Sequence, residues 1–469
     1  MMSEIKDILQ KKNIMLSVFF LMGVFSTMPI IGIHFGNRDI SMYKIFFFVS
    51  IFYGLYRMIR DRKIMIGKKS GVLLAWLGVA CIGGLCGWIF LRGSESAFSS
   101  SAFSWLTKAV VLIAFLLAWM GVKTRTEASD MVSDGFLTGC VFNCIWGVID
   151  MISFHVFNKI EGYNGMILNN IIFGGYIERN GIARRLSLWV PGSNTYRVAG
   201  FNGDPANLGF IAPILVGYAI TKRKYWLFIP AVGALFVSAS TTGLVTTAFI
   251  ILINLPFMLK KYPVKRFLIA VLALVITGGV FIFFASRELI PGSVDDTFNY
   301  FIERIITVYM NPDNLDIRVY YVLFAARAFI AIFPFVFFGV GIGNASLGYG
   351  RMGVTVEQFN KEDFAIPFDM ENTYLAYLMD TGIIGFILFM AVLVILFRYY
   401  RKNVNSDPDT PVNSVMWAFI CSTVVCLLFY HYILYAPMMM MLTIGLAQID
   451  FKENTTVNLV DVLLRRNKK

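Results

Sequence analysis

Long apolar runs separated by short clusters of Lys and Arg are the feature that most constrains this chain. Each run is about 20 residues long, the length that an α-helix needs to cross a bilayer. Hydrophobic residues make up 57% of the 469 residues and charged residues only 15%, too few to cover a soluble protein of this size. Because lipid requires each segment to satisfy its own backbone polar groups, the sequence predicts an all-α, polytopic membrane protein.

The basic clusters predict the topology. The formal net charge is +12, which in a soluble protein would suggest a nucleic-acid partner. Here the clusters, such as residues 60–63 and 222–224, lie between apolar runs, so they mark cytoplasmic loops and we expect no nucleic acid to bind. Placing every strong cluster on one side gives about 12 spans, with both termini in the cytoplasm.

This topology divides the chain into spans, two cytoplasmic ends and two large loops outside the cytoplasmic membrane, which we call the outside loops. The segments are the N-terminus (1–13), spans 1–5 (14–157), the first outside loop (158–204), spans 6–9 (205–286), the second outside loop (287–371), spans 10–12 (372–449) and the tail (450–469). We expect the tail to form a short helix on the cytoplasmic surface, where its final Lys and Arg favour anionic lipid.

The first outside loop ends with a sequence that suits an anion site. Asp204 is a good helix N-cap, and Pro205 suits the first helical position. Arg197 precedes them across a Gly-rich stretch. Exposed N–H groups and a guanidinium would bind an anion, although a cap and a surface arginine explain the same residues.

The second outside loop repeats this logic. A turn at residues 311–314 precedes an amphipathic helix that we expect to start near Leu315. Arg318 then lies in the first turn, where the positive helix end disfavours an isolated cation and favours an anionic partner. Tyr321 shares its face. An amphipathic helix lying on the membrane is the alternative.

Acidic residues begin the next predicted helix. Glu371 and Asp369 either stabilise its N-terminus or supply a general base at the membrane face. His34, His155 and His431 lie near outer span ends; imidazole suits proton transfer, but each alone is explained as an interfacial polar residue.

Several chemistries lack their sequence signature. The six Cys lie in apolar runs without metal-like or disulfide-like spacing, and no phosphate-binding loop or HExxH motif occurs. Lys44, Lys108 and Asp150 are the main charges that we expect within spans, and a position near a helix end is the alternative for each. Ion-coupled transporters usually carry more charge at mid-span, so a transporter is disfavoured.

Short motifs together resemble the O-antigen ligase and polymerase superfamily. They are Asp316-Ile317-Arg318 with Pro334, the turn Gly339-Val340-Gly341-Ile342-Gly343, Glu371-Asn372-Thr373-Tyr374-Leu375 and Gly382-Ile383-Ile384-Gly385, with residues 197–207 and 238–243 similar to earlier family blocks. Members are bacterial inner-membrane enzymes that transfer glycans from undecaprenyl diphosphate outside the cytoplasmic membrane. The resemblance implies a GT-C-like helical fold and the same location.

The resemblance implies a membrane glycosyltransferase, a Wzy-type polymerase of undecaprenyl-diphosphate-linked repeat units of O-antigen, capsule or exopolysaccharide. The family pattern has a His where this chain has Glu371. That His is regarded as the base in ligases, so its replacement counts against a ligase, which remains the alternative. A transporter or flippase of lipid-linked sugars is the alternative from another class.

The resemblance also implies roles for single residues. Glu371 would be the acceptor base, with Asp369 in reserve, and Arg197, Arg318, Asn372 and Tyr321 would bind substrate. The lipid diphosphate is already activated, so we expect neither nucleotide nor metal as cofactor. Expected partners are undecaprenyl-diphosphate-linked oligosaccharides and membrane lipids, with a chain-length regulator and a flippase as candidates.

Overall fold

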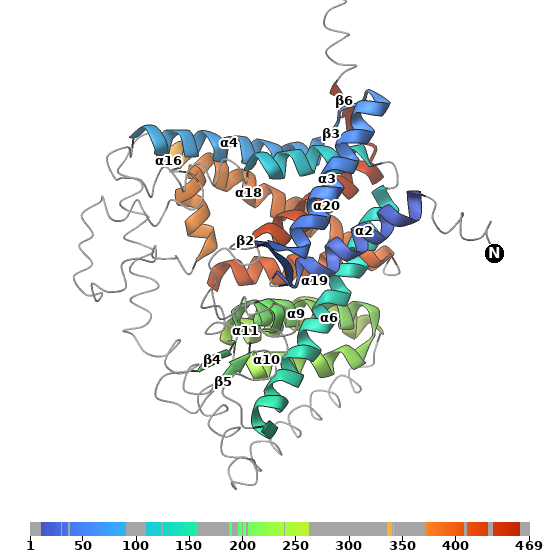
Figure 1. Ribbon diagram of the computed structural model, residues 1–469, viewed down its shortest axis with the longest axis vertical. Coiled ribbons are helices and arrows are strands. Elements are labelled where there is room, and N and C mark those ends of the chain that lie inside the picture. Colours follow the sequence, from blue (N-terminus) through green and yellow to red (C-terminus); the bar gives the residue numbers. More distant parts are fainter. Residues whose placement is uncertain are drawn as a thin grey trace, which may run out of the picture. The chain divides into compact units, whose positions relative to one another are not determined.

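The protein is described by a computed structural model, shown as a ribbon in Figure 1. It describes residues 11–29, 31–35, 38–90, 109–122, 125–157, 187–189, 196–198, 200–202, 205–238, 240–261, 335–339, 341, 372–407, 410–429 and 435–459. This part of the chain is mostly helical, as the apolar runs predict, with three two-stranded antiparallel sheets. The chain divides into two compact units: Met1–Phe47, Asp130–Asn311 and Tyr400–Cys426 form unit 1, and Phe48–Ser129, Pro312–Tyr399 and Leu427–Lys469 form unit 2.

The elements of unit 1 come from three stretches of sequence. They are α2 (Lys11–Ser26), β1 (Gly32–Phe35), β2 (Arg38–Ser41), the start of α3 (Met42–Asp61), most of α6 (Arg125–Phe157), β4 (Ser187–Trp189), β5 (Tyr196–Val198), η2 (Gly200–Asn202), α9 (Pro205–Lys222), η3 (Tyr225–Leu227), α10 (Phe228–Ser238), α11 (Thr241–Lys261), the end of α18 (Thr373–Ser406) and most of α19 (Pro411–Phe429). Unit 2 holds the rest of α3, β3 (Met65–Gly67), α4 (Lys68–Phe90), the helix Ala109–Gly121, α16 (Phe335–Phe338), most of α18, α20 (Tyr435–Lys452) and β6 (Thr456–Asn458).

Helix α9 is the centre of unit 1. It packs against both α10 and α11 (Figure 1), and its residues from Leu208 to Ile220 are buried. Polar groups on its neighbours are bonded inside this core: Ser422 of α19 donates to the Phe210 carbonyl at 3.1 Å, and the Trp417 indole donates to Asn254 of α11 at 2.8 Å. Buried polar groups therefore join helices that apolar packing alone would leave free to slide.

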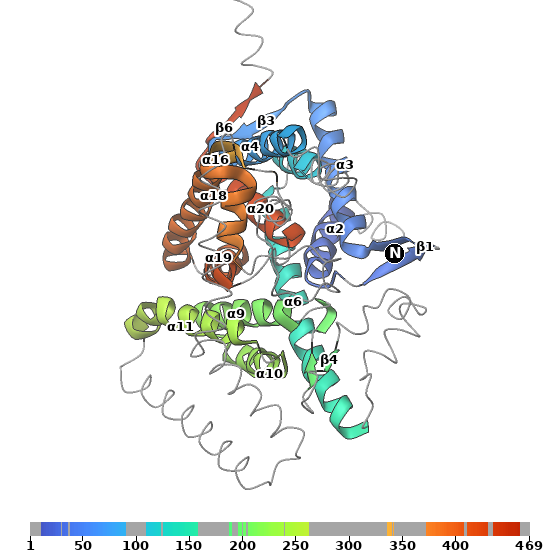
Figure 2. The same ribbon diagram turned by 90° about the vertical axis from the view of Figure 1, so that its left-hand side faces the viewer.

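Helix α4 is the centre of unit 2, where it packs against α16 and α20. In this unit β3 pairs with β6, with Ile66 opposite Val457 (Figure 2). The expected tail helix is therefore wrong for Thr456–Asn458, which form a strand, and α20 continues past residue 450 to Lys452. The β3 backbone offers this segment ladder hydrogen bonds, and they outweigh its weak helical periodicity.

Asp450 closes the N-terminus of α4. Its carboxylate is fully buried and accepts hydrogen bonds from the Lys69 N–H at 2.8 Å and the Ser70 N–H at 2.7 Å. The hydroxyls of Ser70 and Thr455 donate to the same carboxylate at 2.7 and 2.6 Å. The first N–H groups of a helix have no partner inside it, so a residue about 380 positions away acts as the cap.

Apolar helices of the kind that membrane spans require occur along the described part of the chain. Among the described residues, five helices are long and apolar enough to cross a membrane, namely Met42–Asp61, Lys68–Gly87, Arg125–Met151, Thr373–Ser406 and Pro411–Leu428. Shorter apolar helices cover Ile14–Ser26, Ala109–Gly121, Asn207–Lys222, Tyr225–Ser238 and Thr242–Leu255. The predicted span 267–285 lies outside the described residues. The total of 12 spans and the side on which each loop lies remain predictions.

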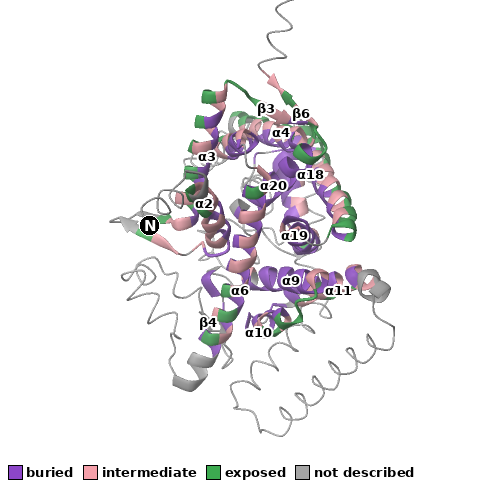
Figure 3. Ribbon diagram, turned by 90° about the vertical axis from the view of Figure 1, so that its right-hand side faces the viewer, coloured by how far each residue is buried: buried purple, intermediate pink, exposed green. Residues whose placement is uncertain are grey.

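Burial differs sharply among these helices, as Figure 3 shows. The described side chains of α19 are almost all buried, whereas α3 exposes Phe52 by 68%, Tyr56 by 58% and Ile59 by 78%. These three residues follow the helical repeat and form one apolar stripe. A stripe of this kind suits contact with lipid tails.

Candidate functional site

Asn372 fixes the start of α18, where the predicted catalytic motif ends. Its side-chain oxygen accepts a hydrogen bond from the Leu375 N–H at 3.2 Å, and its carbonyl accepts one from the Ala376 N–H at 3.0 Å. Asn372 is therefore the N-cap of this helix. It was predicted to bind substrate, and that role stays a prediction, now confined to its amide nitrogen.

Helix α18 is broken at Gly382, the first glycine of the motif Gly382-Ile383-Ile384-Gly385. Gly382 has φ 67° and ψ −177°, a conformation that glycine adopts readily and residues with a Cβ do not. The break removes the helical partner of the Asp380 carbonyl, and the Gly341 N–H occupies that carbonyl at 2.8 Å. The glycine-rich turn after α16 thus repairs the hydrogen bonding of a broken span.

Close backbone contact holds this junction together. A Cβ on Gly83 of α4 would meet the Phe338 carbonyl of α16, and one on Gly382 would meet the backbone of Phe337 and Phe338. The Gly339 N–H caps α16 by donating to the Phe335 carbonyl at 2.7 Å. Helices α4, α16 and α18 therefore meet backbone to backbone, and the first turns of α18 have a rigid base.

Asp380 is a buried acid that the sequence analysis missed. Its side chain is fully buried, two turns beyond the α18 cap. Beside it in the helix, Tyr377 packs edge-on against Trp76 of α4 and Phe389, with ring centroids 5.6 and 4.7 Å away. Acidic residues within spans are costly and commonly functional, so the carboxylate inside an apolar run was the signal that could have found it.

The charges that we predicted within spans differ in burial where the structure describes them. Asp150 of α6 is fully buried, as predicted. Lys44 is exposed near the start of α3, in agreement with a position near a helix end, from which the ammonium reaches the surface. Lys108 lies outside the described residues.

Arg197 lies in β5 of unit 1, opposite Leu188 of β4. Its side chain lies outside the described residues. The segment that follows is fixed by Asn143 of α6, whose side-chain oxygen accepts the Phe201 N–H at 2.9 Å and whose nitrogen donates to the Thr27 carbonyl at 2.7 Å. This buried amide, also missed by the sequence analysis, ties the approach to α9 to α2 and α6.

The remaining predicted site residues are not among those that the structure describes. Glu371, Asp369, Arg318 and Tyr321 all fall outside the described residues, as do the α9 cap Asp204 and His431. His34 and His155 lie in β1 and at the end of α6, with side chains outside the description. Their roles stay predictions, and the described site is the α18 start with its glycine junction.

Metal-ligating residues do not gather in the described part of the chain. No group of three or more His, Cys, Asp or Glu there is placed to hold a metal ion. The six thiols are all free, in or beside apolar helix faces.

Several apolar helices of membrane length, one of them capped by Asn372 and broken at Gly382, are typical of a multi-pass membrane protein. Residues 226–390 match the model of a family described as O-Antigen ligase. The match includes α16, the glycine junction and the first half of α18, and it supports the O-antigen ligase and polymerase superfamily. It also supports glycan handling of the ligase or polymerase type, on lipid-linked glycan substrates in a membrane. No curated protein matches the chain.

Proposed function

We propose that this protein is a polymerase of lipid-linked oligosaccharide repeat units. The donor is a growing glycan on undecaprenyl diphosphate, and the acceptor is the terminal sugar of another lipid-linked unit, outside the bacterial cytoplasmic membrane. The observation that carries the proposal is the family match over residues 226–390, which contains every motif of the second outside loop and of the α18 start.

The reaction is a displacement at the anomeric carbon of the donor. An acceptor hydroxyl oxygen forms the new glycosidic bond, and the bond from the anomeric carbon to the diphosphate oxygen breaks. The lipid diphosphate leaves with the electron pair, and a base takes the hydroxyl proton. The leaving group is already activated, so the reaction needs fixed cations and a base and consumes no nucleotide.

Glu371 is the base in this proposal, with Asp369 in reserve. Glu371 directly precedes Asn372, whose cap fixes the start of α18. The N-terminal end of a helix favours negative charge, so a carboxylate there is ionised and able to accept a proton. The glycine junction holds α18 in place close to this start. A proton acceptor must be held in a fixed position to act, and the junction provides that rigidity.

Arg318 and Arg197 are the cations in this proposal. Arg318 opens a predicted helix in the second outside loop, and the backbone of Arg197 is held in β5. Negative charge develops on the diphosphate as the bond breaks, and fixed guanidinium groups stabilise it. Asn372 contributes its amide nitrogen to the substrate, and Tyr321 an aromatic face and a hydroxyl.

The glycan pattern of a deletion strain separates the candidate functions. Single capped repeat units on the cell surface indicate a polymerase. Long chains retained on undecaprenyl indicate a ligase, and the absence of any surface unit, with units accumulating inside the cell, indicates a flippase. Either of the last two patterns contradicts the proposal.

Purified variants test the residues. Glu371→Gln and Arg318→Ala should each lower the rate of chain extension by about a hundredfold or more, with Arg197→Ala causing a smaller loss. Glu453→Gln and Arg401→Ala, which change exposed residues, are the matched controls and should keep full activity. If well-expressed Glu371→Gln polymerises normally, the base lies elsewhere, and the polymerase assignment stands on the glycan pattern alone.

A further inference from the structure

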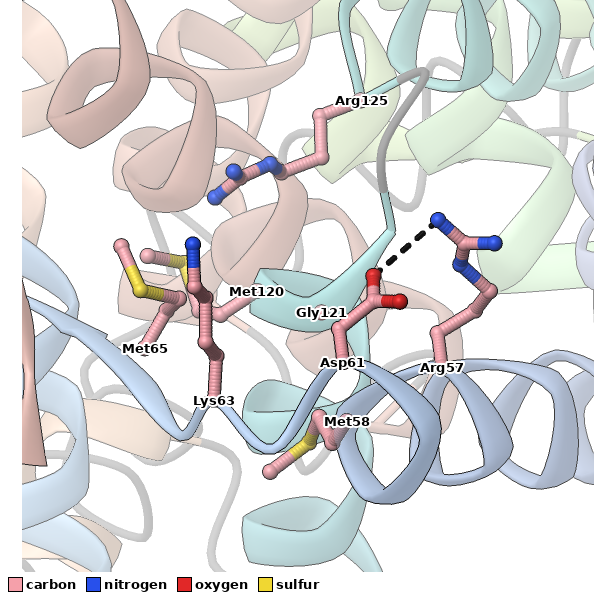
Figure 4. A pocket seen from close by; sticks show the side chains of 8 residues that line it. All are labelled: Arg57, Met58, Asp61, Lys63, Met65, Met120, Gly121 and Arg125. Atoms are coloured by element: carbon pink, nitrogen blue, oxygen red, sulfur yellow. Dashed lines mark hydrogen bonds and ion pairs between the residues drawn. The ribbon is translucent and has the colours of Figure 1, made fainter. Parts of the chain in front are cut away.

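A second polar site lies in unit 2, outside the stretch that matches the family. It is a cavity of about 480 Å³ where α3 ends and α6 begins. Its lining includes Arg57, Asp61, Lys63, Met65, Met120 and Arg125, and Figure 4 shows these side chains. We call it the cationic pocket, because three basic side chains line it with a single carboxylate.

The carboxylate of Asp61 is already engaged. It pairs with Arg57 at 3.1 Å and with the exposed Arg60 at 3.4 Å. Two guanidinium groups therefore share it. Among the described residues that line the pocket, no further acid faces Lys63 and Arg125.

Both pocket arginines keep donors without a partner. The Arg57 side chain is only 9% exposed, and its Nε is buried with no hydrogen bond within the described part of the chain. The same holds for Nε and Nη1 of Arg125. A buried donor on a charged group that makes no hydrogen bond is costly, so these N–H groups suit an acceptor from outside the chain.

The flat face of the Arg125 guanidinium packs against an aromatic ring, and this contact leaves the N–H groups at its edge open to a ligand. Its guanidinium carbon lies 4.8 Å from the centroid of the Phe451 ring, a cation–π contact. In Figure 4 its head group and the ammonium of Lys63 point toward one another. Arg125 is also the first residue of α6, at the positive helix end that disfavours a cation. The nearby ammonium and the helix end both raise the local positive potential.

We propose that the cationic pocket binds a phosphate group. A phosphate is compact, carries the negative charge that Lys63 and Arg125 lack, and accepts the in-plane donors that a guanidinium presents. The walls formed by Met65 and Met120 are apolar, and the exposed stripe of α3 ends beside the pocket. A phospholipid headgroup and a soluble phosphate compound carry the same chemistry, and the experiment separates them.

The test uses the full chain in nanodiscs of neutral phosphatidylcholine, with thermal unfolding followed by tryptophan fluorescence. One arm adds inorganic phosphate at constant ionic strength, and the other replaces part of the lipid by phosphatidylglycerol. The unfolding midpoint should rise in at least one arm. Arg125→Gln and Lys63→Gln should weaken the apparent affinity about tenfold or more, whereas Arg401→Gln, an equal loss of charge at an exposed site, should leave it unchanged.

Each outcome decides something. A rise with phosphatidylglycerol alone identifies a lipid headgroup, and a rise with phosphate alone identifies a soluble ligand. No rise in either arm overturns the proposal, as does an equal rise in all three variants. Lys63 is exposed, so Lys63→Gln remains a valid test even if Arg125→Gln does not fold. The result is independent of the proposed function, because the pocket lies outside residues 226–390.

Discussion

Asp450 and Phe451 are neighbours in α20, yet they serve two opposite kinds of polar region. Asp450 accepts four hydrogen bonds from α4 and Thr455, so every donor that it meets is satisfied by the chain itself. Phe451 stacks on Arg125, whose edge donors remain unpaired in the described structure. The first region is closed, and the second is open to a ligand.

The difference separates structural from ligand-binding charge. A buried charge whose hydrogen bonds are complete needs no ligand, and its loss harms the fold. A charge with open donors contributes little to the fold by itself, and its loss harms binding. Point variants in the two regions should therefore change the free energy of unfolding by different amounts, and only those in the open region should depend on anions.

The largest effect is expected for Asp450→Ala. It leaves the N–H groups of Lys69 and Ser70 buried without an acceptor, and should lower the free energy of unfolding by about 3 kcal/mol. Unfolding by SDS in mixed micelles measures it, with and without phosphate, and the loss should be the same in both. Glu453→Ala, which removes an exposed acid one turn on, should change stability by less than about 0.5 kcal/mol. Equal losses of unfolding free energy for Asp450→Ala and Glu453→Ala would contradict the structural role of Asp450.

The glycine junction is a second closed region, and a matched pair of glycines in α4 tests it. Gly83→Ala places a Cβ against the Phe338 carbonyl and should cost about 2 kcal/mol. At Gly84 no atom lies within 4 Å of an added Cβ, so Gly84→Ala should be neutral or stabilise by up to about 1 kcal/mol. The same unfolding assay compares them. A loss at Gly84 as large as that at Gly83 would show that the junction is not tightly packed.

The open region should show an effect that changes sign. In neutral lipid, Lys63→Gln removes repulsion from Arg125 and should stabilise by about 0.5 kcal/mol. When the anion that the pocket binds is present, the same variant loses a ligand contact and should be less stable than the wild type by about 1 kcal/mol. Unfolding midpoints with and without the anion measure both. A single sign under both conditions would place Lys63 outside the binding site.

The smallest effect is expected at the rim of the pocket. Arg60 pairs with Asp61 at 3.4 Å, and its side chain is half exposed. Exposed ion pairs contribute little, so Arg60→Gln should leave the unfolding free energy unchanged within the error of the measurement. Arg57→Gln, at the buried end of the same acid, should cost more, because its side chain is buried. If Arg60→Gln lowered the unfolding free energy more than Arg57→Gln, burial would not determine how much these charges contribute to stability.

The helices could be predicted from the sequence because their signal is local. The apolar runs predict a mostly helical chain, and the described residues are mostly helical. The three-residue strand β6 was predicted as helix, because its strand partner β3 lies some 390 residues earlier. Apolar content cannot reveal a partner so distant.

The candidate site could be predicted only in part. The motif at residues 371–375 marked the start of α18, and Asn372 caps it. Asp380 was missed although an acid inside an apolar run is itself a signal. Asn143 was missed because an amide in such a run does not show which distant backbone groups it binds. The cationic pocket could not be predicted, because Lys63 belongs to a cluster that indicates topology and only the fold brings it near Arg57 and Arg125.

The contact between Asp450 and α4 sets an order on how the protein is made. Residues 69 and 70 leave the ribosome about 380 residues before the carboxylate that caps them, and β3 waits as long for β6. The beginning of α4 stays incomplete during synthesis, so this part of unit 2 is completed only when α20 has been synthesised. A change near residue 450 therefore acts on an early helix at the latest moment of assembly.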